Sequence, residues 1–187
     1  MGLFGWFRGA SAADQRRQAW HREWEAAIAT PTRDAHARLV QHLAPIASAA
    51  AAARDDVELE EEMLEALDAL LAAIEQHAQS GLPVISTSHH IVFTDTCHFT
   101  APASMPDEPG QPGGRLLLTS TRAIFVGGPA PTIRPWHATA EVARTGRDLL
   151  LVRRAEDAGV RFRCNTFADA VRAAFIARHL AGRRGPL

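Results

Sequence analysis

Histidine and cysteine residues gather in one short stretch of the chain, and their side chains are the ones best suited to metal chemistry. His89, His90, Cys97 and His98 are ligand types that zinc accepts, and His137 offers a further imidazole. Neighbouring side chains of an extended strand point to opposite faces, so His89 and His90 diverge, as do Cys97 and His98. The spacing therefore predicts ordinary strand residues and no bound metal.

Patterns typical of nucleophilic or phosphate chemistry are not found in the sequence. Serine, histidine and aspartate are present, but none lies in the strand–turn–helix pattern of a nucleophile elbow. No glycine-rich loop precedes a helix in the way that a phosphate cradle requires. The Gly-Gly-Pro sequence at 127–129 separates two predicted strands and indicates a turn. We therefore predict no catalytic residue and no cofactor, with a small enzyme or metal protein as a remote alternative.

The composition is typical of a globular, cytoplasmic protein. Of the 187 residues, 47% are hydrophobic and 22% are charged. No apolar run approaches the roughly 20 residues of a membrane-spanning helix, and the N-terminus lacks the basic start of a secretory signal. Cys97 and Cys164 are too few for a disulfide framework and are predicted to be buried thiols. All 20 basic residues are arginine, a bias that suggests a bacterial source.

Charge is segregated along the chain, although the net charge is only −1. Residues 1–54 carry +3, residues 55–81 carry −9 and residues 82–187 carry +5. The acidic and basic parts should attract each other, so we expect the acidic part to mask a basic face. A near-neutral total with few aromatic residues disfavours nucleic acid as a partner.

Residues 12–29 have the apolar periodicity of an amphipathic helix, with Trp20 and Trp24 on one face. Thr30 is followed by proline, which predicts an N-cap and the first turn of a second helix. Pro45 lies within this second helix, where we expect a kink or a new helix start because proline cannot donate a backbone hydrogen bond.

Residues 56–79 form the most regular predicted helix, and the glycine and proline at 81 and 83 end it. Acidic residues crowd its N-terminal end, where the helix dipole favours negative charge. A short turn near Arg54 joins it to the preceding helix, so we predict an antiparallel helical hairpin. The same apolar stripe would also suit a homodimer through the hairpin.

After Pro83 the pattern changes to short strands rich in β-branched and aromatic residues. Strands are predicted at residues 84–87, 90–99, 115–119, 122–127, 131–136, 138–144, 148–153 and 159–164. Residues 101–114 contain four prolines and three glycines and are predicted to be a surface loop. Thr166 and Asp169 have the spacing of a capping box that starts a helix running to about Leu180.

Alternation along the strands predicts which side chains face the core. In the last strand, Val160, Phe162 and Cys164 alternate with Arg161 and Arg163. The predicted core of this part of the chain is Phe93, Leu116, Leu118, Ile124, Phe125, Leu149, Leu151, Phe162, Val171 and Phe175.

Residues 84–181 resemble the pleckstrin-homology-like (PH-like) superfamily, and within it the GRAM-like and bacterial PH-like branch. That branch has a signature of the form Gly-x-Leu-x-Leu-Thr-x-x-Arg-x-x-Phe. The matching residues here are Gly114, Leu116, Leu118, Thr119, Arg122 and Phe125. Proteins of this kind bind lipid head groups, peptides or other domains and are rarely catalytic, so the resemblance implies a binding module. The helical hairpin is not part of the family pattern.

Two groups of residues are candidates for a binding site. An anion- or lipid-binding surface would use arginines of neighbouring strands and turns, namely Arg144, Arg147, Arg153, Arg154, Arg161 and Arg163. Membrane contact would use the aromatic residues of the N-terminus, namely Phe4, Trp6 and Phe7. The alternative for the arginines is a solvated sheet face in an arginine-rich protein.

The sequence thus predicts an α+β protein in three parts. Residues 1–11 form a flexible apolar N-terminus, residues 12–81 a helical hairpin, and residues 82–187 a PH/GRAM-like antiparallel β-barrel or sandwich closed by a C-terminal helix. The predicted function is a non-catalytic binding or adaptor module that engages an unidentified protein through the hairpin, the sheet or both. The alternative is a peripheral lipid-binding protein at the inner face of an anionic membrane.

Overall fold

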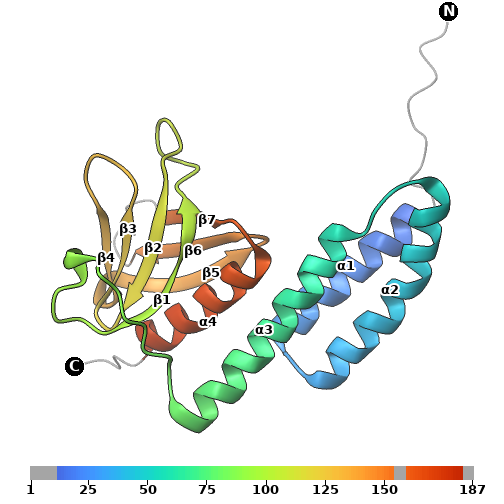
Figure 1. The fold of residues 1–187 in the computed structure, drawn as a ribbon, viewed down its shortest axis with the longest axis horizontal. Coiled ribbons are helices and arrows are strands. Elements are labelled where there is room, and N and C mark those ends of the chain that lie inside the picture. The colour runs from blue at the N-terminus through green and yellow to red at the C-terminus, as the bar shows by residue number, and fades with distance from the viewer. Residues whose placement is uncertain (1–11, 154–158, 183–187) are drawn as a thin grey trace, which may run out of the picture. The chain divides into compact units, whose positions relative to one another are not determined.

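The structure is a computed structural model and describes residues 12–153 and 159–182. The chain divides into two compact units, residues 1–71 and residues 72–187. Among the described residues, helices come first, then seven strands, then a C-terminal helix (Figure 1), which confirms the predicted α+β class. No helix among the described residues is both long enough and apolar enough to cross a bilayer.

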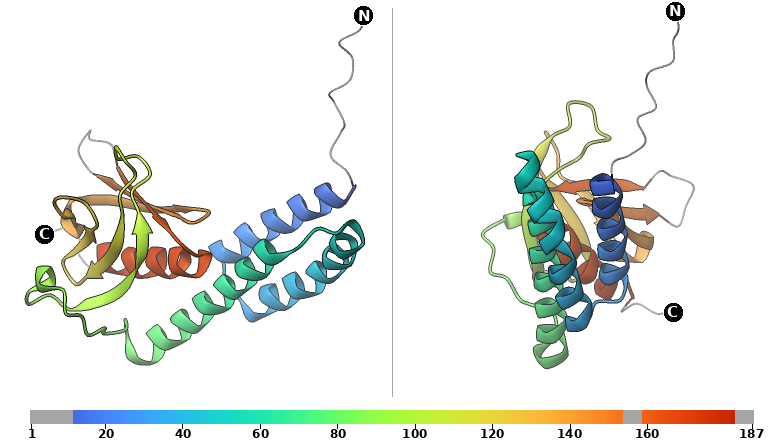
Figure 2. Two further views of the ribbon diagram at one scale, coloured as in Figure 1. Left: turned by 45° about the horizontal axis from the view of Figure 1, so that its top comes forward. Right: turned by 90° about the vertical axis from the view of Figure 1, so that its right-hand side faces the viewer.

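Three helices make up the N-terminal part: α1 (Ala12–Ala29), α2 (Arg33–Ala53) and α3 (Glu58–Ser80). They run side by side in alternating directions (Figures 1 and 2). The predicted stripe of tryptophans ties them together, because the indole N–H of Trp20 donates to the Leu39 carbonyl of α2 at 2.9 Å. The indole N–H of Trp24 donates to the Met63 carbonyl of α3 at 2.5 Å.

Two details of α2 differ from the prediction. Thr32, and not Thr30, is the N-cap, and its hydroxyl accepts a hydrogen bond from the Ala35 N–H at 3.1 Å. The Thr30 hydroxyl instead donates to the Ala26 carbonyl, within the end of α1. Of the two outcomes expected at Pro45, a kink or a new helix start, the new start does not occur, because α2 continues through Pro45 to a left-handed C-cap at Arg54.

A buried carboxylate lies among the helices of residues 12–71. Glu60 is only 2% exposed. Its Oε1 lies 2.6 Å from His21 Nε2 and 3.5 Å from Arg17 Nε, so α1 supplies both partners of this α3 side chain. A buried charge is tolerated only when it is paired in this way.

The strands form one antiparallel sheet in the order β4-β3-β2-β1-β7-β6-β5. Their bounds are β1 (Cys97–Ser104), β2 (Gly113–Thr119), β3 (Arg122–Val126), β4 (Thr132–Pro135), β5 (Thr139–Thr145), β6 (Asp148–Arg153) and β7 (Val160–Cys164). Strands β5–β7 run across β1–β4 in Figure 1, so the sheet is strongly bent, and the described outer strands β4 and β5 do not pair with each other. Helix α4 (Phe167–Gly182) packs against both halves.

Helix α4 begins as the capping box predicts, because the Thr166 hydroxyl accepts from the Asp169 N–H at 3.0 Å. Its buried face joins the inward side chains of both halves of the sheet in one core. Phe162 and Phe125 stack there with ring centroids 5.9 Å apart. The strand order and the single closing helix are consistent with a PH-like fold.

The segment between α3 and β2 departs most from the prediction. Residues 84–87 contribute only an isolated bridge, between Ile85 and Cys97. His90–Val92 is a short 3₁₀ helix, η1, and β1 starts at Cys97 and runs on to Ser104. Part of the predicted loop is therefore strand. Pro102 is tolerated there because β7 pairs only with Ala103 and Ser104, the last two residues of β1. The edge of β1 that faces β7 is therefore open at Pro102.

Candidate functional site

Residues 84–96, which we call the capping segment, cover an apolar row on the outer face of the β1–β4 half. Leu117 and Ile124 alternate with core residues and point away from α4, yet both are 0% exposed. They form a second apolar cluster with Val92 of the capping segment and Cys97 of β1. The sequence resemblance does not indicate this cluster, because it depends on a segment that precedes the signature.

A polar cluster fixes the end of the capping segment to the turn between β2 and β3. The Thr121 hydroxyl donates to Asp95 Oδ2 at 2.6 Å, and the Thr119 hydroxyl lies 3.1 Å from the same oxygen. Arg122 Nε lies 3.2 Å from it and completes an ion pair. The indole N–H of Trp136 donates to the Thr119 carbonyl at 2.8 Å. The carboxylate is thereby neutralised and held.

The signature residues of the predicted family have structural roles here. Leu116, Leu118 and Phe125 are core residues, while Thr119 and Arg122 belong to the polar cluster just described. A Cβ on Gly114 would lie 2.2 Å from the Val126 carbonyl oxygen of the next strand, so only glycine fits. The signature residues therefore stabilise the β2–β3 hairpin through core packing, the polar cluster and the close approach at Gly114.

Phe93 is the most exposed large apolar side chain of the described residues, at 82%. The prediction that it lies in the core is wrong. It has φ 50° and ψ −119°, and the Asp95 N–H donates to the Val92 carbonyl at 3.0 Å across it. This is the first central position of a type II′ turn, which normally takes glycine. Holding a phenylalanine there costs about 1–3 kcal/mol of strain.

An open groove lies beside Phe93. Its volume is about 700 Å³, and its lining comes entirely from residues 84–97. Val84 is 74% exposed at the groove, and Ile85 and Val92 add apolar surface. Asp95 also lines the groove, but its carboxylate is already paired with Arg122. The groove therefore combines apolar and polar side chains without an unpaired carboxylate. We call Val84, Phe93 and this groove the Phe93 surface.

The arginine candidates on β7 lie next to acids. The Arg161 guanidinium binds Asp107 and lies 3.4 Å from Asp148, and Arg163 binds Asp148 at 2.7 and 3.0 Å. The hydrogen bond to Asp107 raises the pKa of Arg161, and the bond to Asp148 raises the pKa of Arg163. Exposed pairs of this kind weaken the attraction for an outside anion.

The other arginine candidates among the described residues have different neighbours. Arg144 donates to the Gly146 carbonyl at 2.6 Å, and the Arg147 guanidinium lies 4.9 Å from the centre of the Phe167 ring. Arg153 ends β6 and pairs in register with Thr139. Arg154 lies outside the described residues, as do the membrane-contact candidates Phe4, Trp6 and Phe7.

Two of the histidine and cysteine candidates for metal binding have contacts of their own. His98 Nδ1 lies 2.7 Å from the Pro83 carbonyl oxygen, and the Cys97 thiol donates to the Phe99 carbonyl at 3.3 Å. Within residues 12–153 and 159–182, no three His, Cys, Asp or Glu side chains gather closely enough to hold a metal ion.

Both thiols are expected to be unreactive in the folded chain. Burial, followed by the charges of Asp169 and Asp148, raises the pKa of Cys164 to about 12, and burial also raises the pKa of Cys97. Because the thiolate is the nucleophile, a thiol–disulfide exchange reagent at about pH 8 should label neither cysteine in the native chain and both after denaturation. Native labelling as fast as that in denaturant would contradict this.

Folding favours the neutral thiol of Cys164. The contribution of this thiol to the free energy of unfolding should therefore fall as pH rises above 9.0, the ordinary pKa of a cysteine.

Comparisons with known proteins give likeness in structure only. No protein-family model matches the sequence, and no curated protein matches it. The N-terminally truncated linker-DH/PH domains of p115-RhoGEF match with a TM-score of 0.45 and 6% identity, over 94% of this chain and 56% of that chain. A DH/PH fragment of PDZRHOGEF, solved in complex with human RhoA, matches with a TM-score of 0.41 and 10% identity, over 91% of this chain and 54% of that chain. The chain thus spans about half the length of these structures.

Proposed function

We propose that this chain is a non-catalytic binding module of the cytoplasm that engages a protein partner through the Phe93 surface. One observation carries the proposal: an aromatic side chain, 82% exposed, is held on a backbone conformation that suits glycine. The turn at Phe93 places Asp95 against the β2–β3 turn, but that role does not require a phenylalanine, whose side chain is left exposed. Strained residues that persist in this way are concentrated at functional sites.

The chemistry of the Phe93 surface favours a protein over a lipid. Exposed aromatic residues are typical anchors of protein interfaces, where they fill a pocket of the partner. Membrane binding would need several apolar side chains together with free cations. Arg122, an arginine that contacts this segment, is already paired with Asp95. Anionic-lipid binding through the arginine candidates remains the alternative, and the experiment below includes it.

Replacing Phe93 with glycine should raise stability and reduce binding at once. Glycine relieves the positive φ without loss of buried contacts, so the free energy of unfolding should rise by about 1 kcal/mol. The loss of the aromatic anchor should weaken partner binding by about 30-fold or more, which corresponds to about 2 kcal/mol. Urea unfolding measures the first effect and calorimetric titration measures the second.

The partner for that titration comes from photo-crosslinking in cells that express the protein. A photoreactive phenylalanine analogue at position 93 should give one discrete protein adduct, which mass spectrometry identifies. The same analogue at Val40, an exposed α2 residue (46%), is the matched control and should not give it. Equal labelling at both positions, or an adduct with a second copy of this chain, would overturn the proposal. So would unchanged affinity of the Phe93→Gly variant, or flotation with anionic vesicles that depends on Arg161 and Arg163.

A further inference from the structure

The capping segment, residues 84–96, has little regular structure. It contains the short helix η1 and one isolated bridge, between Ile85 and Cys97. Its described backbone bonds to neighbouring strands and turns lie at its two ends. The Ile85 N–H donates to the Cys97 carbonyl at 2.8 Å, and the Ser120 N–H donates to the Thr96 carbonyl at 2.9 Å. Segments with so few backbone bonds are the parts of a fold that open at low cost.

Few apolar contacts hold the middle of the capping segment in place. Val92 is buried in the cluster with Leu117 and Ile124, and two isoleucines of the segment pack against that cluster only partly. Val84 and Phe93 are exposed. The apolar surface that the segment buries is therefore small.

The main core of this part of the chain lies on the other face of the sheet. It is shared by the inward side chains of the strands and α4, and its described members include no residue of the capping segment. Leu82, just before the segment, belongs to this core, and Cys97, just after it, begins β1. The segment could therefore lift between two fixed ends without disturbing the core.

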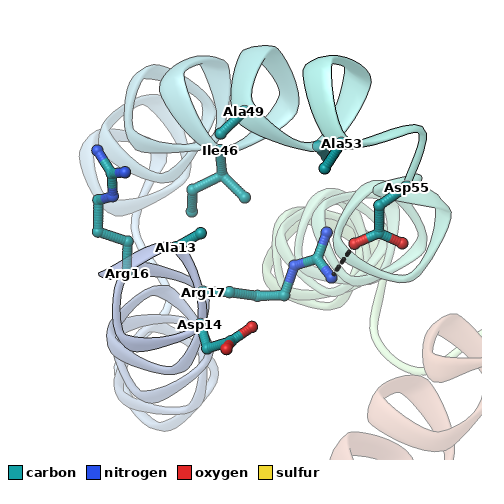
Figure 3. Close-up of a pocket in the computed structure, with 9 residues that line it drawn as sticks. Ala13, Asp14, Arg16, Arg17, Ile46, Ala49, Ala53 and Asp55 are labelled. Atoms are coloured by element: carbon teal, nitrogen blue, oxygen red, sulfur yellow. Dashed lines mark hydrogen bonds and ion pairs between the residues drawn. The ribbon is translucent and has the colours of Figure 1, made fainter. Parts of the chain in front are cut away.

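The groove at the capping segment differs from the hollow in the helical unit, residues 1–71. That hollow, of about 170 Å³, lies between the regular helices α1 and α2, with the ion pair of Arg17 and Asp55 at 2.9 Å beside it (Figure 3). The groove, of about 700 Å³, is lined entirely by residues 84–97. One irregular stretch of chain thus forms all of its walls, so the groove can rearrange without movement of a helix.

Two features of the capping segment act in opposite directions. The positive φ of Phe93 strains the closed form, and this strain is released when the segment opens. Asp95 holds the segment closed, because it accepts from the Thr121 hydroxyl at 2.6 Å and lies 3.2 Å from Arg122 Nε. Closure therefore depends largely on one carboxylate and on the buried side chain of Val92.

We infer that the capping segment is a hinged cover, which opens while the rest of the β-sheet unit, residues 72–187, stays folded. Opening breaks the bonds of Asp95, relieves Phe93 and uncovers the apolar row of Leu117 and Ile124 on the outer face of the sheet. The cover thus controls whether this row is accessible from solvent. The inference does not rest on the function proposed above, because opening can be observed without a partner.

The two cysteines report on different kinds of opening. Cys97 lies in the cluster under the capping segment, whereas Cys164 is buried on β7 outside that cluster. A brief reaction with a thiol reagent labels neither, but a long one records how often each thiol is uncovered. In the full chain, mass spectrometry should find Cys97 labelled at least about 10-fold faster than Cys164. Urea below the unfolding transition should change the Cys97 rate little, because local opening exposes little surface.

Variants of the segment test the strain and the carboxylate. Phe93→Gly should slow the labelling of Cys97 about 5-fold, since it removes strain from the closed form only. Val84→Gly, at an exposed position of the same segment without a positive φ, is the control and should not slow it. Asp95→Asn should speed it about 10-fold, because hydrogen bonds to a charged group are the stronger ones. Asp107→Asn, which changes a carboxylate bound to β7, should leave it unchanged.

A core variant separates opening of the cover from unfolding of the whole unit. Phe162→Leu weakens the main core, which the open and closed forms share, so it should speed the labelling of Cys164 and leave that of Cys97 unchanged. Circular dichroism must first show that each variant is folded. The inference is overturned by equal labelling rates for the two thiols in the natural chain, by parallel acceleration of both in Phe162→Leu, or by labelling of Phe93→Gly as fast as that of the natural chain.

Discussion

Phe162→Ala should destabilise the β-sheet unit by about 3–5 kcal/mol, which is a large part of the total stability of a domain. The Phe162 side chain is 0% exposed and stacks on Phe125 across the bent sheet. Truncation removes its apolar contacts and leaves a cavity that the surrounding strands and α4 fill only in part. Urea unfolding followed by the fluorescence of Trp136, which is buried in the same core, measures the loss.

Arg163→Ala, on the same strand, is the matched control. Its side chain is 54% exposed and its partner is Asp148, so loss of this solvent-screened pair should change stability little. The two variants differ by one position along β7 but point to opposite faces of the sheet. Similar losses for both would mean that Phe162 does not pack in the core as described.

Periodicity predicted the elements that bury one face. In β7, Val160, Phe162 and Cys164 are buried while Arg161 and Arg163 are not, as alternation requires. The capping box at Thr166 located the start of α4, since hydroxyl capping is a local effect of the backbone. These elements were predictable because the residues that determine them lie within a few positions of each other in the sequence.

The capping segment was not predictable in the same way. Its β-branched and aromatic composition favours strand, and residues 84–87 and 90–99 were predicted accordingly. The structure instead uses Asp95 to bind hydroxyl groups more than twenty residues further along the chain, which turns the backbone at Val92–Asp95. Such a side-chain bond between distant residues leaves no periodic signal.

The candidate site shows the same limit. Sequence separation does not reveal that Asp148 lies opposite Arg163 in the ladder of β6 and β7, so the arginines were predicted without their partners. Phe93 was predicted to be buried because phenylalanine usually is. Phenylalanine rarely adopts a positive φ, so neither hydrophobicity nor backbone propensity predicts the exposed turn at Phe93, the position proposed for binding.

Trp24→Ala should destabilise the helical unit by about 3–5 kcal/mol, the other large effect expected in this chain. Trp24 is 0% exposed and is one of the α1 side chains that contact α3. Its removal both opens a cavity and breaks the bond from the indole N–H to the Met63 carbonyl. The expected result is loss of cooperative helix unfolding at physiological temperature, measured by far-ultraviolet circular dichroism.

Trp24→Phe separates the two contributions. A phenyl ring retains much of the packing but cannot donate to Met63, so the loss should be smaller, about 1–2 kcal/mol. Trp20, which donates to Leu39 of α2, remains in both variants and reports on the other helix contact by fluorescence. If Trp24→Ala lost no more stability than Trp24→Phe, the ring would not be packed between the helices, and α1 would be held by Trp20 and the buried Glu60 pairs alone.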